Sequence, residues 1–133
     1  MEKLFNLNQI HLAFSKVKGG ADFPRYVQDL KSIGVTHYDN YVSDGRTKYY
    51  GSEGYSIEGE PKYPEMEVSE WGSADKLKHA LLIHQHGQTD YPTFCRQAAE
   101  AGVEKWITHM IEMTVTYTDK SGKILVAETI PAP

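Results

Sequence analysis

The segment Asp22-Phe23-Pro24-Arg25-Tyr26 has a counterpart 68 positions later, Asp90-Tyr91-Pro92-Thr93-Phe94. Both consist of an aspartate, an aromatic residue, a proline, any residue and a second aromatic residue. Ten residues after each proline comes a Gly-Val pair, Gly34-Val35 or Gly102-Val103. Glycine, proline and aspartate mark turns and helix starts, so matched positions for them carry structural meaning. The constant offset therefore predicts that one structural unit occurs twice.

The first copy is typical of two helices followed by strands. Residues 8–18 carry apolar side chains at helical spacing before a Gly-Gly pair, which predicts an amphipathic helix. Asp22 is placed to cap a second helix, with Pro24 in the first turn, where a missing N–H costs nothing. Gly34 ends that helix as a left-handed C-cap does. Strands are then predicted over residues 35–42, 47–50 and 55–57, and the short turns between them indicate antiparallel hairpins.

The second copy follows in the same order. Ser73 is placed to cap a helix that ends near Gly87, and Thr89 or Asp90 to cap the next helix, which ends at Gly102. Strands are predicted over residues 103–110, 113–118 and 124–128.

An acidic connector, residues 58–72, lies between the copies and carries five glutamates. We expect Tyr63 and Trp71 to anchor it, and residues 66–68 to form a short edge strand.

These elements predict an α+β fold. With 133 residues, 40% of them hydrophobic, the chain can build one core, and we expect a single domain over residues 1–133. It would consist of two tandem α-α-β-β-β repeats, at about 8–57 and 73–128. Neither repeat can bury enough area alone. We therefore expect an antiparallel sheet, or two abutting sheets, with helices packed on one face and a pseudo-twofold relation between the repeats.

Composition excludes several classes of function. The net charge of -4 argues against non-specific binding to nucleic acid, which needs a dense footprint of lysine and arginine. No apolar run approaches the roughly 20 residues that span a bilayer, so no membrane partner is expected. Cys95 is the single cysteine, which leaves no disulfide framework and favours a reducing, cytoplasmic location.

The stretch His84-Gln85-His86-Gly87-Gln88-Thr89-Asp90-Tyr91-Pro92-Thr93-Phe94-Cys95 resembles a segment of a family of small uncharacterised bacterial proteins. Some members of that family carry the label "phage envelope protein". Residues 101–106, 113–117 and 47–51 are similar to the same family, although His86 departs from the small or polar residue expected before Gly87. The resemblance implies no activity and no catalytic residues, and we do not infer virion structure from the label.

Several side chains are candidates for chemistry, and each also has a structural explanation. The six histidines lack the spacing of a metal site, so no metal and no cofactor is expected. Asp90 is better explained as a helix cap, and Cys95 as a small core residue. His84 sits near a helix C-terminus, where a positive charge is favourable.

The tyrosines are the least ordinary feature of the sequence. Tyr38 and Tyr41 point to opposite faces of a strand, and so do Tyr49 and Tyr50. Since one face must meet the helices, the other would present tyrosine rings and hydroxyls, which are frequent at binding surfaces. The residues that we select as candidates for binding are Tyr38, Tyr50, His84, Asp90, Cys95 and Trp106.

The sequence favours a non-catalytic binding or protein-interaction module, with an unidentified small molecule or protein as partner and a homodimer as one option. The alternative is an enzyme acting on a small molecule in the cleft between the repeats, with His84, Asp90 and Cys95 as the residues to test first. A phage-derived structural component is a third reading, which rests on the family label alone. An enzyme predicts a closed pocket with titratable side chains about 3 Å apart. A binding module predicts a shallow aromatic patch on an open sheet.

Overall fold

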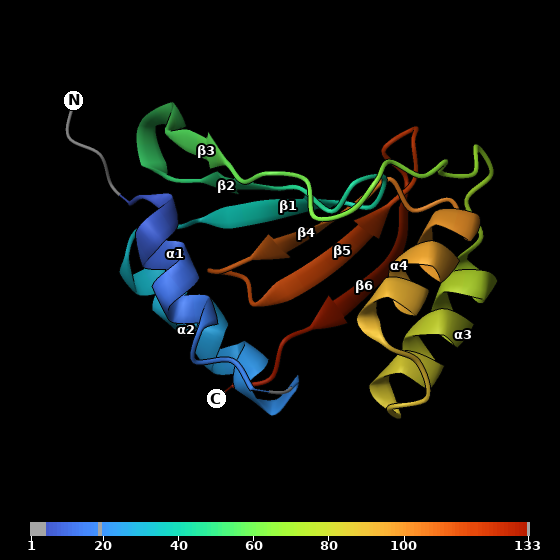
Figure 1. Cartoon of the computed structure of the whole chain (residues 1–133), viewed down its shortest axis with the longest axis horizontal. Helices are drawn as coiled ribbons and strands as arrows, with labels where there is room; N and C mark the ends of the chain where they lie inside the picture. Colours follow the sequence, from blue (N-terminus) through green and yellow to red (C-terminus); the bar gives the residue numbers. More distant parts are fainter. Residues whose placement is uncertain (1–4, 19, 133) are drawn as a thin grey trace.

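The computed structural model describes residues 5–18 and 20–132. Two helices are followed by three strands, and this order occurs twice, as the sequence predicts (Figure 1). Two short 3₁₀ turns lie at Gly20–Asp22 and Ser52–Gly54. The first half contains α1 (Leu7–Phe14), α2 (Phe23–Ser32), β1 (His37–Tyr41), β2 (Thr47–Tyr50) and β3 (Ser56–Glu58). The second half contains α3 (Ala74–Gln85), α4 (Tyr91–Glu100), β4 (Lys105–His109), β5 (Thr114–Thr118) and β6 (Ile124–Thr129).

The strands form one six-stranded antiparallel sheet in the order β3-β2-β1-β4-β5-β6. The two halves meet where β1 pairs with β4, with His37 opposite His109 and Tyr41 opposite Lys105. At the centre of this pair Asp39 lies opposite Ile107, and these two residues are 68 positions apart. The pseudo-twofold axis therefore passes between Asp39 and Ile107, which occupy equivalent places in the two halves.

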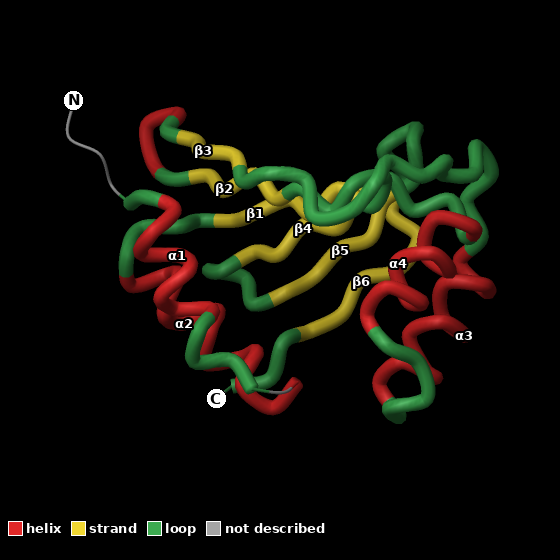
Figure 2. The backbone as a smooth tube through the Cα atoms, viewed as in Figure 1, coloured by secondary structure: helices red, strands yellow, loops and turns green. Residues whose placement is uncertain are grey.

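Both helix pairs cover the same face of the sheet, one pair at each side of the molecule (Figure 2). The core lies between the helices and that face. Its most deeply buried side chains come from the helices and from the segments that lead into the central strands, among them Val27, Leu30, Leu77, Ala98 and Val103. Each helix buries one apolar stripe, as the 3.6-residue period requires.

The predicted end of the first helix and the predicted role of Trp71 are both wrong. The first helix ends at Phe14 rather than at residue 18, because the chain tightens there into i→i+3 hydrogen bonds, and the Phe14 ring is largely exposed. Trp71 is 82% exposed and does not anchor the connector through its ring. The backbone of Trp71 makes the contact instead, since it lies so close to Gly102 that a Cβ atom there would be 2.6 Å from the Trp71 carbonyl oxygen.

Two further local expectations are corrected. Residues 66–68 form no strand, although Met66 N–H donates to the carbonyl of Ser43 at 2.7 Å. Asp22 precedes α2 but makes no capping hydrogen bond, because its carboxylate accepts the Lys18 N–H instead, at 2.8 Å. None of the described helices combines the length and the apolar character needed to cross a bilayer.

Candidate functional site

The six residues selected from the sequence lie on different parts of the fold. Tyr38 and Trp106 face the helices and are buried, at the centre of the covered face. Tyr50 lies on the opposite face and is half-buried. The alternation of side chains along β1 and β2 was predicted correctly, but it separates these candidates instead of bringing them together.

His84, Asp90 and Cys95 each have separate partners. The Nδ1 atom of His84 is 3.0 Å from the Thr89 carbonyl oxygen, and its ring stacks on Phe94. Asp90 caps α4 by accepting the Thr93 N–H at 2.8 Å. Cys95 is buried, and burial raises the pKa of its thiol, although the neighbouring Tyr63 and Tyr91 hydroxyls oppose that shift. A buried thiol with a raised pKa stays protonated at neutral pH, and Cys95 packs as a core residue.

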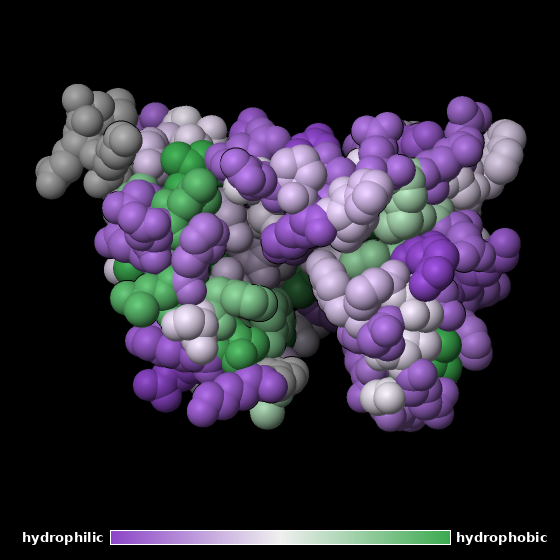
Figure 3. All heavy atoms as spheres, viewed as in Figure 1, coloured by the Kyte–Doolittle hydropathy of each residue, from purple (hydrophilic) through white to green (hydrophobic). Residues whose placement is uncertain are grey.

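On the helix side, the surface is hollowed between the two helix pairs (Figure 3). A chain of polar contacts ties α3 to the sheet there. The Tyr117 hydroxyl donates to one carboxylate oxygen of Glu128 at 3.1 Å, and Gln85 donates to the other at 3.0 Å. These contacts link α3, β5 and β6, and they are explained by the packing of α3 and α4 on the sheet.

The other face of the sheet is not covered by any of the described helices (Figures 1 and 2). The alternation along each strand decides which side chains reach it. We call the group at its centre the open-face cluster, which consists of His37, Asp39, Tyr41, Tyr50, Lys105 and His109.

Asp39 is the centre of this cluster. It is only 4% exposed, although it belongs to the uncovered face, because longer side chains close over it. Its carboxylate lies 3.3 Å from the Lys105 ammonium and accepts a long hydrogen bond of 3.5 Å from the Tyr50 hydroxyl. Lys105 comes from the other half of the chain, so this ion pair crosses the β1–β4 junction.

Three aromatic rings form a row across three neighbouring strands. The His37 ring stacks on Tyr50, with 4.3 Å between ring centroids and an interplanar angle of 9°. On its other side His37 faces His109 at 6.2 Å and 26°. The row is half-buried, so the outer edges of its rings reach solvent.

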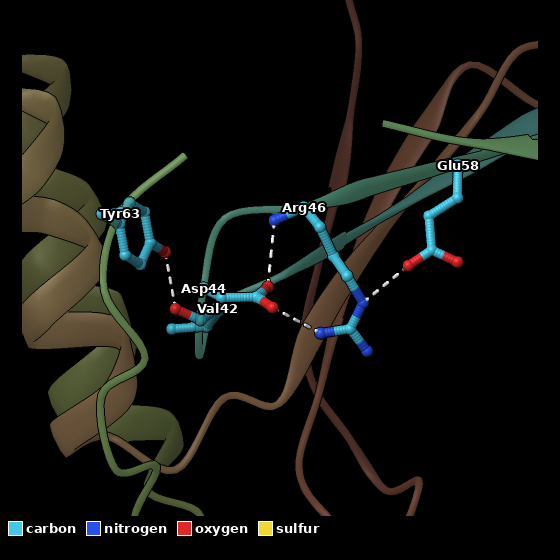
Figure 4. Close-up of polar contacts among 5 residues, drawn as sticks. All are labelled: Val42, Asp44, Arg46, Glu58 and Tyr63. Atoms are coloured by element: carbon cyan, nitrogen blue, oxygen red, sulfur yellow. Dashed lines mark hydrogen bonds and ion pairs between the residues drawn. The ribbon is translucent and has the colours of Figure 1, made fainter. Parts of the chain in front are cut away.

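Arg46 adds a fixed cation beside the cluster (Figure 4). Its guanidinium contacts Asp44 at 2.9 Å and Glu58 at 3.0 Å, and its central carbon lies 4.1 Å above the centroid of the Tyr41 ring. The same figure shows Tyr63 donating to the Val42 carbonyl, which fixes the connector beside the β1–β2 turn. Arg46 is therefore held in one orientation by two carboxylates and an aromatic face.

Electrostatic interactions within the cluster shift its titratable groups. Burial lowers the pKa of His37, and the nearby His109 and Lys105 add to that shift against the opposing charge of Asp39. Burial alone would lower the pKa of Lys105, but the Asp39 carboxylate outweighs it and the net shift is upward. Burial and the Asp39 charge raise the pKa of Tyr41 and Tyr50. At neutral pH the His37, Tyr41 and Tyr50 rings are therefore neutral.

A cavity of about 530 Å³ adjoins the cluster at the end of β1. Tyr41 belongs to both the cluster and the cavity, whose other walls include Arg46, Glu104, Lys120 and connector residues 65–68. Its volume is in the range of small-molecule sites, about 300–1,000 Å³. A ligand on the open face could therefore extend into a concave region beyond Tyr41.

Of this cluster, only Tyr50 is among the binding candidates predicted from the sequence. Asp39 and Lys105 are separated by 66 positions, and only the β1–β4 pairing brings them together. The 68-residue offset relates residue 39 to residue 107, but only the register of the β1–β4 pair sets them opposite each other. Within the described part of the chain, no three of the His, Cys, Asp and Glu side chains are grouped to hold a metal ion.

The cluster has the features of a recognition surface. It presents the edges of half-buried aromatic rings, the Lys105 ammonium and a buried carboxylate, and the Arg46 guanidinium is held in a fixed position beside it. The fold and this surface define an α+β protein whose antiparallel sheet carries helices on one face and a polar aromatic cluster on the other.

Comparison with known proteins places the chain in a family. It belongs to the family described as "Protein of unknown function (DUF1398)", which matches residues 11–129. It is also similar to "Uncharacterized protein YcgX" of Escherichia coli (strain K12), with 22% identity over 117 residues, covering 88% of this chain and 87% of that protein. These matches support the expected family of uncharacterised bacterial proteins. Neither description mentions a phage envelope, so that part of the resemblance is not supported.

Proposed function

We propose that this chain is a non-catalytic binding module that recognises its ligand on the open-face cluster. One observation carries the proposal: Asp39 is a nearly buried carboxylate on a face without helices, while its pseudo-twofold equivalent is Ile107. Burying a carboxylate costs free energy that an ion pair only partly offsets. Because the same sheet position accepts isoleucine in the other half, the fold does not require a charge there. A costly residue that the fold does not require is typical of a functional surface.

Substitution of Asp39 by the residue of the equivalent position tests this argument. In Asp39→Ile, we expect the free energy of unfolding in urea to stay within about 1 kcal/mol of the parent chain or to rise. The change does not leave Lys105 as a buried charge without a partner, since its side chain is 28% exposed and its ammonium can reach water. A loss of more than about 3 kcal/mol would show that Asp39 is a structural residue and would contradict the proposal.

Ile107→Asp is the matched control. It places a second carboxylate directly opposite Asp39, where like charges on neighbouring strands repel. We expect it to lower the free energy of unfolding by about 1–3 kcal/mol. If Asp39→Ile keeps or raises the free energy of unfolding while Ile107→Asp lowers it, the cost belongs to the buried charge. If both substitutions lower it, this part of the sheet is sensitive to substitution in general.

Binding itself is tested by NMR. Fragments that differ in charge and ring content are added to the ¹⁵N-labelled chain, and the shifted amides are mapped. We expect the shifts to gather on β1, β2 and β4, with Asp39→Ile abolishing them. Shifts confined to the hollow between the helix pairs would favour the cleft as the binding site instead.

The enzyme alternative has less support, because His84, Asp90 and Cys95 have separate partners.

We further propose that the chain is one domain derived from a duplicated unit, since the bounds of α2, Phe23–Ser32, shifted by 68, are those of α4, Tyr91–Glu100. The cytoplasm stays the proposed location because a lone, buried cysteine suits a reducing compartment. A homodimer stays a prediction that light scattering on the purified chain can test.

A further inference from the structure

We infer that the hollow between the two helix pairs is a second binding site, and that it takes a small molecule with a primary ammonium group. This site lies on the face of the sheet opposite the open-face cluster, so the inference goes beyond the proposed function and uses other residues. Three observations carry it: a row of polar side chains on the covered face, hydroxyl groups without partners in that row, and a carboxylate without a cation.

A row of side chains crosses the covered face from β2 to β6. The strand registers place these residues opposite one another in the order Tyr49, Tyr38, Thr108, Val115 and Glu128. We call them the covered-face row. Four of the five carry a polar group, although a sheet face that meets helices is ordinarily apolar. Strands β4, β5 and β6 cross the space between the helix pairs (Figure 1), where the surface is hollowed (Figure 3).

Thr108, at the middle of the row, has a hydroxyl without a partner. The residue is 1% exposed, and its Oγ1 atom is enclosed without a hydrogen bond to any described residue. Tyr38 lies opposite Thr108, but the two hydroxyls do not meet the geometry of a hydrogen bond. An enclosed hydroxyl without a partner costs free energy, and such a group is typically completed by a molecule from outside the chain.

Three phenol hydroxyls gather beside Thr108. Tyr26, from α2, lies next to the row, since burial and then the neighbouring Tyr49 and Tyr38 hydroxyls raise its pKa. None of these three hydroxyls makes a hydrogen bond of standard geometry to another described residue, and none is fully enclosed. They therefore reach solvent on the covered face and can accept hydrogen bonds from a ligand.

The charge at the end of the row is negative. Glu128 is half-buried, and Tyr117 and Gln85 donate to its two carboxylate oxygens. No lysine or arginine of the described residues lies within ion-pair distance of Glu128. Nor does a described cation shift the pKa of any tyrosine in or beside the row. An ammonium ion would gain from this carboxylate and from the phenol oxygens, whereas an anion would be repelled.

Aromatic rings border the row and supply apolar contact area. The Trp106 ring lies 5.8 Å, between centroids, from both Phe94 of α4 and Tyr117 of β5. Aromatic rings attract cations and pack against alkyl groups. The site therefore suits an ammonium group on a short alkyl chain.

Three four-carbon probes separate charge from size in NMR titrations of the full chain: n-butylammonium, butan-1-ol and butanoate. The reporters are the Trp106 indole N–H and the methyl groups of Thr108 and Val115, which lie on the covered face. We expect n-butylammonium to shift these signals and to bind at least about 3-fold more tightly than butan-1-ol. Butanoate should leave them unchanged.

Glu128→Gln tests the charge. We expect it to weaken n-butylammonium binding about 3- to 10-fold, because it removes the carboxylate charge and keeps the shape of the side chain. Glu100→Gln, at the exposed end of α4, is the matched control and should bind like the parent chain. Thermal unfolding confirms that each variant is folded.

Thr108→Val tests the unpartnered hydroxyl independently of Glu128. Valine keeps the shape of threonine and removes the enclosed polar atom, so the urea midpoint should stay the same or rise. Binding of n-butylammonium should weaken about 2- to 5-fold. A lower urea midpoint would show that the fold itself uses this hydroxyl, against the inference.

The remaining results also decide between the two proposals. If butan-1-ol or butanoate binds as tightly as n-butylammonium, or Glu128→Gln has no effect, the ligand class is wrong. If none of the three probes shifts the reporters, the hollow is not a binding site, and the proposed function stands because it rests on the other face. If n-butylammonium binds as expected while no fragment binds the open face, this inference stands and the proposed function fails.

Discussion

His37 shows how a single side chain on the open face makes stability depend on pH. Burial lowers its pKa below the ordinary value of 6.5, so the unfolded chain binds this proton more readily than the folded chain does. The stabilisation from neutral His37 is therefore fully present above pH 6.5 and is lost as the pH falls through that value toward the lower pKa of the folded state.

We expect the free energy of unfolding in urea to fall between pH 7.5 and pH 5.5. His37→Phe keeps a ring against Tyr50 but removes the titrating group, so its fall should be smaller. His79→Phe, on the exposed surface of α3, is the control and should follow the parent chain. An identical pH dependence in His37→Phe and the parent would show that another group is responsible.

The open-face cluster also shows what can be predicted about single residues. The alternation His37-Tyr38-Asp39-Asn40-Tyr41 correctly places Tyr38 and Tyr41 on opposite faces, because side chains alternate along any strand. The alternation does not predict which of these two faces the helices cover. Trp71 is likewise exposed, although its size and apolar character predict that it anchors the connector.

Among the elements, the two equivalent helices α2 and α4 begin differently. Asp90 accepts the Thr93 N–H and caps α4, and the Thr93 side chain, together with that N–H, lowers the pKa of its carboxyl group. Asp22 holds the same position before α2 but turns to the Lys18 N–H. The sequence motif is shared, while the preceding chain, which runs through a 3₁₀ turn before α2, decides what the carboxylate binds.

Alanine substitutions at the two caps should therefore differ. We expect Asp90→Ala to lower the urea midpoint, because an N–H at the start of α4 loses its acceptor. Asp22→Ala should have a smaller effect, since it removes a loop contact and not a helix cap. Because the Asp90 pKa is lowered, its contribution is present above about pH 4 and lost in more acidic solution. Equal effects at neutral pH would contradict the assignment of the caps.

For the whole molecule, the continuous sheet couples the two halves. The β1–β4 pair joins them through five residue pairs, and the ion pair between Asp39 and Lys105 crosses the same junction. In either half alone, the junction strand, β1 or β4, would be an edge strand with unpaired backbone N–H and C=O groups. The two halves should therefore unfold together.

We expect one cooperative transition. Trp106 is 8% exposed and reports on the centre of the covered face, whereas Trp71 is in solvent. In Trp71→Phe, urea unfolding followed by Trp106 fluorescence should coincide with unfolding followed by far-ultraviolet circular dichroism. Two separated midpoints would show that the halves are independent, against the single domain proposed here.

The sequence by itself determined the order of the elements, the offset of 68 between the halves and the antiparallel hairpins, because capping, periodicity and turns act between near neighbours. Only the tertiary structure decided that β1 pairs with β4, that His37 meets His109 and that Asp39 meets Lys105. These contacts depend on which face the helices bury and on the register of the central strands. Both are set by the packing of the whole chain, and no short stretch of sequence contains them.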